Sequence, residues 1–69
     1  MEIIKLRDEF IKLGQALKAA NLVEDAVEAK YLIQDGLVTV NGEVDTRRGR
    51  KLYDGDVVAY DGQEIKIVK

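Results

Sequence analysis

Apolar residues recur with the period of a helix in the first half of this 69-residue chain. Four of them fall at positions i, i+3, i+4 and i+7, namely Leu13, Ala16, Leu17 and Ala20. This spacing predicts one apolar stripe on a helix that covers residues 12–20. Asn21 follows directly, and asparagine is a residue at which helices commonly end.

A second helix is predicted to begin at Glu24-Asp25 and to end at Gly36. Asp25 can cap its first turn, where acidic side chains also suit the helix dipole. Its apolar face is made of Ala26, Ala29 and Ile33, with Leu32 beside them. Glycine is a typical residue just past the C-terminal end of a helix. Because few residues connect the two predicted helices, we expect a compact hairpin or an L-shaped pair.

Beyond the second helix the hydrophobic pattern changes to a period of two. Val38 and Val40 point to one side of a predicted strand, while Leu37 and Thr39 point to the other. Asn41-Gly42 then predicts a two-residue hairpin turn, because both central positions of that turn need a positive φ.

Further strands are predicted on both sides of this hairpin. Ile3, Ile4 and Leu6 indicate a short first strand, whereas Phe10-Ile11 fits either a helix or a strand. Strands are also predicted at Val44, 57–60 and 65–68, with turns at 54–56 and 61–62. The order of a strand, two helices and a small mostly antiparallel sheet indicates an α+β fold, in a single domain over residues 1–69.

The composition argues against most kinds of catalysis. The chain has no histidine, serine or cysteine, which are the usual general base and the usual nucleophiles, so we expect no enzyme. The two main ligands of zinc are therefore absent as well, and a domain this short has little volume for a deep pocket. We expect no cofactor, no metal and no small-molecule substrate.

Signals for a membrane or for secretion are also missing. No run of about 18 apolar residues exists that could span a bilayer. The N-terminal segment Met1–Lys5 lacks the basic region and apolar stretch of a secretion signal. A chain without cysteine suits the reducing cytosol. We therefore expect a cytoplasmic protein without membrane contact. The sequence leaves the oligomeric state open, and a monomer is the favoured form.

Positive charge is concentrated in one short segment of an otherwise acidic chain. The net charge is −2, yet four of the five residues from Arg47 to Lys51 are cationic. Charge gathered in this way on a small domain indicates local recognition of a polyanion, with nucleic acid as the leading candidate. Tyr53 is the one tyrosine near this segment, but the spacing of the tyrosines predicts no aromatic platform, and nothing in the pattern supports base stacking.

Several motifs of the chain together resemble one known family. They are Gln15-Ala16-Leu17-Lys18, Glu28-Ala29-Lys30-x-x-Ile33, Gly36-x-Val38-x-Val40-Asn41-Gly42-Glu43-Val44, Thr46-Arg47-Arg48-Gly49-Arg50-Lys51 and Gly55-Asp56-x-Val58. This pattern is similar to the S-four RNA-binding domain, and within that family to the small stand-alone bacterial proteins of the YaaA/YbcJ type. The resemblance covers nearly the whole chain, and residues 36–56 are its specific part.

The resemblance implies a helix-loop-helix RNA-binding surface, the alpha-L motif, packed on a small mostly antiparallel sheet. In such domains, basic and polar residues of both helices and of the adjoining loop contact structured RNA. Carried over by position, the expected RNA-binding residues are Gln15, Lys18, Lys30, Arg47, Arg48, Arg50 and Lys51. Many relatives have two glycines where this chain has Ala26-Val27, so we expect less room for a phosphate at the start of the second helix.

The function implied is a non-catalytic RNA-binding module. Stand-alone relatives work with ribosomal RNA, so the expected partner is structured RNA of the large ribosomal subunit, in ribosome assembly or quality control. We expect Lys18, Lys30 and the 47–51 segment to converge on one positive face, because separate segments bind one RNA only if it can touch them together. Most acids, Glu2, Asp61 and Glu64 among them, are expected elsewhere.

Two other functions are compatible with parts of the pattern. A small protein–protein adaptor could dock an acidic partner through the basic segment. A ubiquitin-like sulfur carrier also uses Val-Asn-Gly-Glu turns, but its chemistry needs a C-terminal Gly-Gly. This chain ends in Ile67-Val68-Lys69, which disfavours the carrier.

Overall fold

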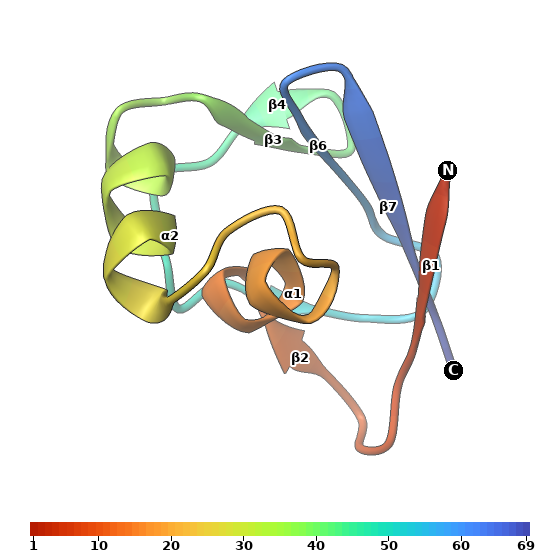
Figure 1. Cartoon of the computed structure of the whole chain (residues 1–69). Helices are drawn as coiled ribbons and strands as arrows, with labels where there is room; N and C mark the ends of the chain where they lie inside the picture. Colours follow the sequence, from red (N-terminus) through yellow and green to blue (C-terminus); the bar gives the residue numbers. More distant parts are fainter.

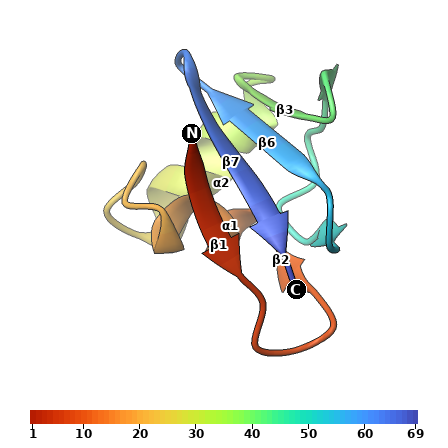
Figure 2. The ribbon, with the colours of Figure 1, turned by 90° about the vertical axis from the view of Figure 1, so that its right-hand side faces the viewer.

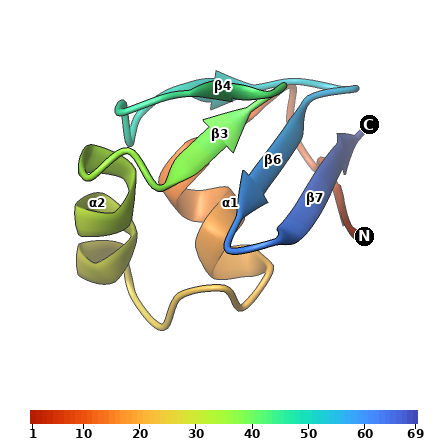
Figure 3. The ribbon, with the colours of Figure 1, turned by 90° about the horizontal axis from the view of Figure 1, so that it is seen from above.

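Two helices cover one face of a five-stranded sheet in the computed structural model, which describes all 69 residues (Figures 1 and 2). The elements in chain order are β1 (Glu2–Lys5), β2 (Ile11–Lys12), α1 (Leu13–Ala19), α2 (Ala26–Gln34), β3 (Val38–Val40), β4 (Glu43–Val44), β5 (Lys51–Leu52), β6 (Val57–Tyr60) and β7 (Gln63–Val68). Figure 3 shows α1 and α2 lying side by side next to the sheet. The predicted α+β fold is confirmed.

The main sheet is antiparallel except at one edge. Its strand order is β1-β7-β6-β3-β4, and only β1 and β7 run parallel. Along β7 the buried Ile65 and Ile67 alternate with the exposed Glu64 and Lys66, as expected for a strand with one covered face. The helices therefore pack on the face that carries the isoleucines, and the opposite face is open to solvent.

Left-handed backbone at two hairpins confirms the turn predictions. Asn41 and Gly42 have φ values of 53° and 85°, and Asp61 and Gly62 have 51° and 77°. Positive φ at both central residues is the geometry that matches the twist of the flanking strands. The Asn41 side chain also accepts a hydrogen bond from the Val57 backbone N–H at 2.9 Å, which ties the β3–β4 hairpin to β6.

Both helices end in the same way, and the second is capped at its start as predicted. Asn21 and Gly36 follow α1 and α2 with φ values of 59° and 77°, so each chain reversal uses a left-handed residue. At the start of α2, Asp25 Oδ1 accepts a hydrogen bond from the Glu28 backbone N–H at 2.8 Å. This bond satisfies one of the amides that a helix start leaves free.

Twelve buried apolar residues form one hydrophobic core between the helices and the sheet. They are Leu13, Ala16, Leu17, Val23, Ala29, Ile33, Val38, Val40, Leu52, Val58, Ile65 and Ile67. One expectation was wrong, because Ala26 is exposed and does not share the buried face of α2. Ala26 is the first residue of that helix, and the core instead includes Val23 from the preceding loop.

A second sheet of only two short strands connects distant parts of the chain. The segment at Phe10-Ile11, which fitted either kind of element, contributes Ile11 to strand β2, and β2 pairs antiparallel with β5. Ile11 lies opposite Leu52, and Lys12 lies opposite Lys51. The pairing brings the cationic segment 47–51, called the basic loop below, to the N-terminal end of α1.

Candidate nucleic-acid interface

The basic loop is attached to the start of α1 by main-chain hydrogen bonds. The backbone N–H of Leu13 donates to the Arg50 carbonyl at 2.8 Å, and that of Gly14 donates to the Arg48 carbonyl at 3.1 Å. A helix leaves its first amides without partners inside the helix, and here the loop satisfies two of them. The loop therefore has a defined position relative to α1.

Inside the loop, one buried carboxylate holds two arginines. Asp45 is only 6% exposed, and its Oδ2 lies 2.9 Å from Arg47 Nη2 and 2.8 Å from Arg50 Nη1. Asp45 Oδ1 also accepts from Arg47 Nε at 3.1 Å and from the Arg47 backbone N–H at 2.9 Å. The two guanidinium groups are thereby fixed around a single acid, and these are the two ion pairs of the structure.

The same contacts shift the ionisation of both partners. The hydrogen bond from Arg47, aided by that from Arg50, holds the pKa of the Asp45 carboxyl far below its usual range, despite the opposing effect of burial. The hydrogen bond to Asp45 in turn raises the pKa of the Arg47 guanidinium. At neutral pH the cluster is thus one carboxylate between two cations, with a net positive charge.

A groove between α1, the basic loop and the start of α2 gathers cations without acids. It is lined by Lys12, Gly14, Gln15, Lys18, Ala26, Arg48 and Gly49, and it is called the α1–loop groove below. No carboxylate is among the lining residues, and neither Lys12, Lys18 nor Arg48 has an ion-pair partner. Charges in such a groove remain available to an external anion.

Glycine at position 14 makes room for one wall of this groove. A Cβ atom added to Gly14 would lie 2.8 Å from Arg48 Cγ, closer than real Cβ contacts. The stem of Arg48 therefore packs directly on the first turn of α1, where this residue lines the groove. Gln15 also has a local role, since its Oε1 accepts from the Lys12 backbone N–H at 3.2 Å.

The other predicted binding residues divide between a second hollow and an open helix surface. Arg47, Arg50 and Lys51 line a hollow that adjoins the α1–loop groove at Gly49. Lys30 lines neither, but it lies exposed on α2, one turn beyond Ala26 and hence on the side of α2 that borders the groove. The structure therefore brings six of the seven residues together directly, and their role in RNA binding stays a prediction.

The start of α2 is closed to a phosphate by its own side chains. Asp25 accepts from the Glu28 backbone N–H, and Glu28 Oε1 accepts from the Glu24 backbone N–H at 2.9 Å. These carboxylates take up amides that an anion at a helix N-terminus would use. Together with the side chains of Ala26 and Val27, they favour α1 and the loop over α2 as the place for phosphate contacts.

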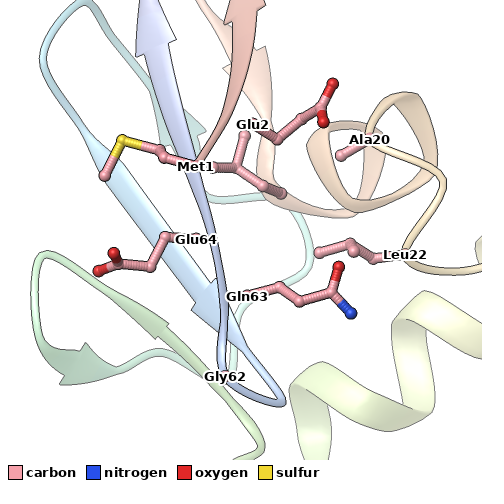
Figure 4. A pocket seen from close by; sticks show the side chains of 8 residues that line it. Met1, Glu2, Ala20, Leu22, Gly62, Gln63 and Glu64 are labelled. Carbon is pink, nitrogen blue, oxygen red and sulfur yellow. The ribbon is translucent and has the colours of Figure 1, made fainter.

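Acidic residues gather at the other end of α1. Figure 4 shows a hollow around Met1, Glu2, Gln63 and Glu64, with Ala20 and Leu22 on its helical side. Asp61 is in the β6–β7 turn that borders this hollow through Gly62. Glu2, Asp61 and Glu64 are thus separated from the α1–loop groove, as expected.

Three residues of the α1–loop groove and the adjoining Asp45 cluster were not predicted from the sequence as parts of a binding surface. Lys12 falls at the start of the predicted first helix, Gly14 has no turn signal around it, and Asp45 is a lone acid between two uncharged residues. The signal for Lys12 exists only in the pairing of β2 with β5, which places it opposite Lys51. Like charges opposite each other weaken a strand pair, and here the two lysines add to the positive charge at the start of α1.

Fold and surface together define a class: an α+β domain that presents cations at a helix start and on an adjoining loop. The family model of the S4 domain, the S-four RNA-binding domain, matches residues 4–68. The chain therefore belongs to the S4 domain family. The S4 domain is an RNA-binding fold and not a catalytic one, so the chain is not an enzyme. Its two helices, of 7 and 9 residues, are also too short to cross a membrane.

Two known proteins are similar over most of the chain. The "Probable ribosome maturation protein RlbA" of Bacillus subtilis is 48% identical over 59 residues, which cover 86% of this chain and 83% of that protein. The solution structure of YbcJ from Escherichia coli, described as revealing an alpha-L motif involved in RNA-binding, superimposes with a TM-score of 0.77 at 30% identity. It covers 100% of this chain and 89% of YbcJ, so the two helices form the alpha-L arrangement.

Proposed function

We propose that the domain binds structured RNA through the α1–loop groove and the basic loop beside it. The observation that carries the proposal is the lining of the groove, where Lys12, Lys18 and Arg48 stand without any carboxylate. Phosphate oxygens are the natural ligands of such a cluster, and phosphate contacts set the orientation of a protein on RNA. The family and the description of YbcJ support RNA as the partner.

The RNA is, in our proposal, ribosomal RNA of the large subunit, and the domain acts in ribosome assembly or quality control. The support is the similarity to a protein named for ribosome maturation. Recognition would depend mainly on shape, because the major groove of an A-form helix is too narrow for side chains to read. A ribosomal target would place the domain in the cytoplasm, and the groove is complete within one copy of the chain.

Reversing the charge of Arg48 tests the interface. Arg48→Glu should weaken binding to a labelled ribosomal RNA hairpin roughly tenfold or more, as expected from the loss of one charge-assisted contact and the added repulsion. Fluorescence anisotropy measures the affinity, and circular dichroism checks the fold. Lys66→Glu is the matched control, because Lys66 is exposed on the uncovered face of the sheet. It makes the same change in net charge away from the groove.

The comparison of the two variants separates the possible outcomes. Equal losses for Arg48→Glu and Lys66→Glu would mean that net charge alone drives binding. Normal RNA binding by a folded Arg48→Glu variant would contradict the interface and favour the adaptor that docks an acidic protein. Crosslinking in cells, followed by sequencing of the bound RNA, tests the ribosomal target, and recovery of other RNAs alone would contradict it.

A further inference from the structure

The hollow next to the α1–loop groove contains an aromatic ring among its cations. It is lined by Arg47, Gly49, Arg50, Lys51, Tyr53 and Asp56, and it is called the Tyr53 hollow below. Tyr53 is its one hydrophobic lining residue, and 49% of that residue is exposed. Tyr53 is not part of the hydrophobic core, and its exposed ring lies beside three cations.

Packing on one side holds this ring in place. The rings of Phe10 and Tyr53 have centroids 6.2 Å apart at an angle of 53°, and Lys51 Nζ lies 4.8 Å from the centre of the Phe10 ring. The Tyr53 backbone N–H donates to Asp56 Oδ2 at 2.8 Å. Main chain and ring are thus both supported, while about half of the residue stays open to a ligand.

The charges around the ring are similarly fixed. Arg47 and Arg50 are held by Asp45, and their side chains remain 71% and 30% exposed. Asp56 is the acid of the hollow, and its carboxylate is occupied by Asn41 Nδ2 at 3.0 Å and by the Tyr53 N–H. The hollow therefore combines a flat apolar surface with an excess of positive charge. A nucleotide is complementary to both features, because it carries a flat base and a negatively charged phosphate.

We propose that the Tyr53 hollow binds one unpaired nucleotide of the RNA, with its base stacked on Tyr53 and its phosphate beside Arg50 and Lys51. The proposal rests on the RNA-binding function proposed above. A base inside a duplex has both faces covered by its neighbours, so only an unpaired base can stack on a protein ring. Because the hollow adjoins the α1–loop groove at Gly49, the target is a paired segment with a bulge, loop or end beside it.

Two kinds of synthetic RNA test the hollow: a fully paired hairpin, and a set of hairpins of the same sequence that each carry one bulged adenosine, at successive positions. The wild-type protein should bind at least one bulged hairpin more tightly than the paired one. Tyr53→Leu should lose about 5- to 150-fold in affinity for that bulged hairpin, the range expected for one stacked base. Its affinity for the paired hairpin should stay unchanged, and Tyr53→Phe, which keeps the ring, should bind both as the wild type does.

A matched control is available on α2. Tyr31 is 59% exposed and lines none of the cationic hollows, so Tyr31→Leu makes the same change on another surface and should bind both RNAs normally. A crosslink provides a second readout on the unaltered protein. With 4-thiouridine at the bulge, irradiation should attach the RNA to the peptide that contains Tyr53.

The outcomes distinguish this proposal from the general one. If the wild type binds all hairpins equally and Arg48→Glu weakens each of them, the RNA-binding function stands and the Tyr53 hollow is overturned. Normal binding of the bulged hairpin by Tyr53→Leu, or a crosslink that maps to another segment, overturns it too. Failure of the wild type to bind any of the hairpins would contradict the proposed function itself.

Discussion

Asp45 is the one charged side chain that the fold buries, and it lies beneath a surface proposed to bind an anion. Its carboxylate lowers the positive charge of the basic loop, yet it fixes Arg47 and Arg50. A free arginine gives up as much as about 2 kcal/mol of rotamer entropy when a ligand immobilises it. An arginine already held by Asp45 has lost part of that freedom on folding, so the acid favours binding through pre-organisation.

We predict that Asp45→Asn destabilises the domain by about 1–3 kcal/mol at pH 7, because charge-assisted hydrogen bonds become weak ones. The pKa of Asp45 is lowered by folding, so its stabilising effect is complete above its unfolded pKa of about 4 and is lost as the pH falls below that value. Urea unfolding at neutral and acidic pH measures the free energy of unfolding, and the difference between wild type and variant should become smaller in acid.

Glu64→Gln is the control for this titration, because Glu64 is an exposed carboxylate without a hydrogen-bond partner. It should change the free energy of unfolding little, because the side chain makes no ion pair. The difference in free energy of unfolding between wild type and Asp45→Asn should become smaller below about pH 4. If it stays constant from neutral pH to below about pH 4, the assigned role of the ion pairs is contradicted.

Local sequence rules for turns and helix caps predict the structural role of some residues and not of others. The φ values at Asn41 and Gly42 follow from turn chemistry, and the Asp25 cap follows from its place before an apolar helix pattern. Asp45 escapes such rules, because its burial depends on two arginines that the backbone turn places around it. Gly14 escapes them as well, since a glycine near a helix start has no local signature for a packed neighbour.

At the scale of elements, the start of α1 and the basic loop behave as one unit. Strands β2 and β5 hold them together with two residues each, and the amides of Leu13 and Gly14 continue the contact into the helix. Apolar periodicity predicted α1, the core side of β3 and the later strands. It could not predict β2–β5, because strands this short depend on a partner about forty residues away rather than on their own pattern.

We predict that Gly14→Ala separates stability from binding. Alanine is a better helix former than glycine by up to about 1 kcal/mol, so the thermal midpoint should stay the same or rise. The new methyl group would displace the stem of Arg48, and RNA affinity should fall about tenfold, the equivalent of roughly 1.4 kcal/mol for one misplaced contact.

A double-mutant cycle checks that this effect passes through Arg48. In an Arg48→Ala background, Gly14→Ala should cause little further loss of RNA affinity, because there is no longer a guanidinium group to displace. An undiminished loss in that background would mean that the methyl group itself obstructs the RNA.

At the scale of the molecule, an acidic protein presents a basic face. The net charge is −2, while residues 12–18 and the basic loop converge on adjoining hollows and Glu2 and Glu64 lie at the opposite end of α1. The charge cluster itself was visible in the sequence. Its convergence with Lys18 followed only from the family resemblance, because no local pattern relates a residue of α1 to a loop thirty positions later.

Salt should weaken RNA binding steeply if this face contacts phosphates. For about four contacts on an irregular RNA, the slope of log K against log salt should be about −3, at roughly −0.7 for each contact. Anisotropy titrations over a series of potassium chloride concentrations measure the slope. Arg48→Glu should make it shallower by about 1, whereas a flat dependence in the wild type would rule out electrostatic binding.

The attachment of the basic loop to α1 should make the folding equilibrium of the free chain differ from that of the RNA-bound chain. The proposed anion site exists only when β2–β5 and the Asp45 ion pairs have formed, and the unfolded chain, at net −2, has little attraction for RNA. A ligand selective for the native state shifts the folding equilibrium, by about 2.7 kcal/mol when it is present at a hundred times its Kd. Copies of this small domain in excess of their RNA would therefore be unfolded for a larger fraction of the time than bound copies, which would expose them more to proteolysis.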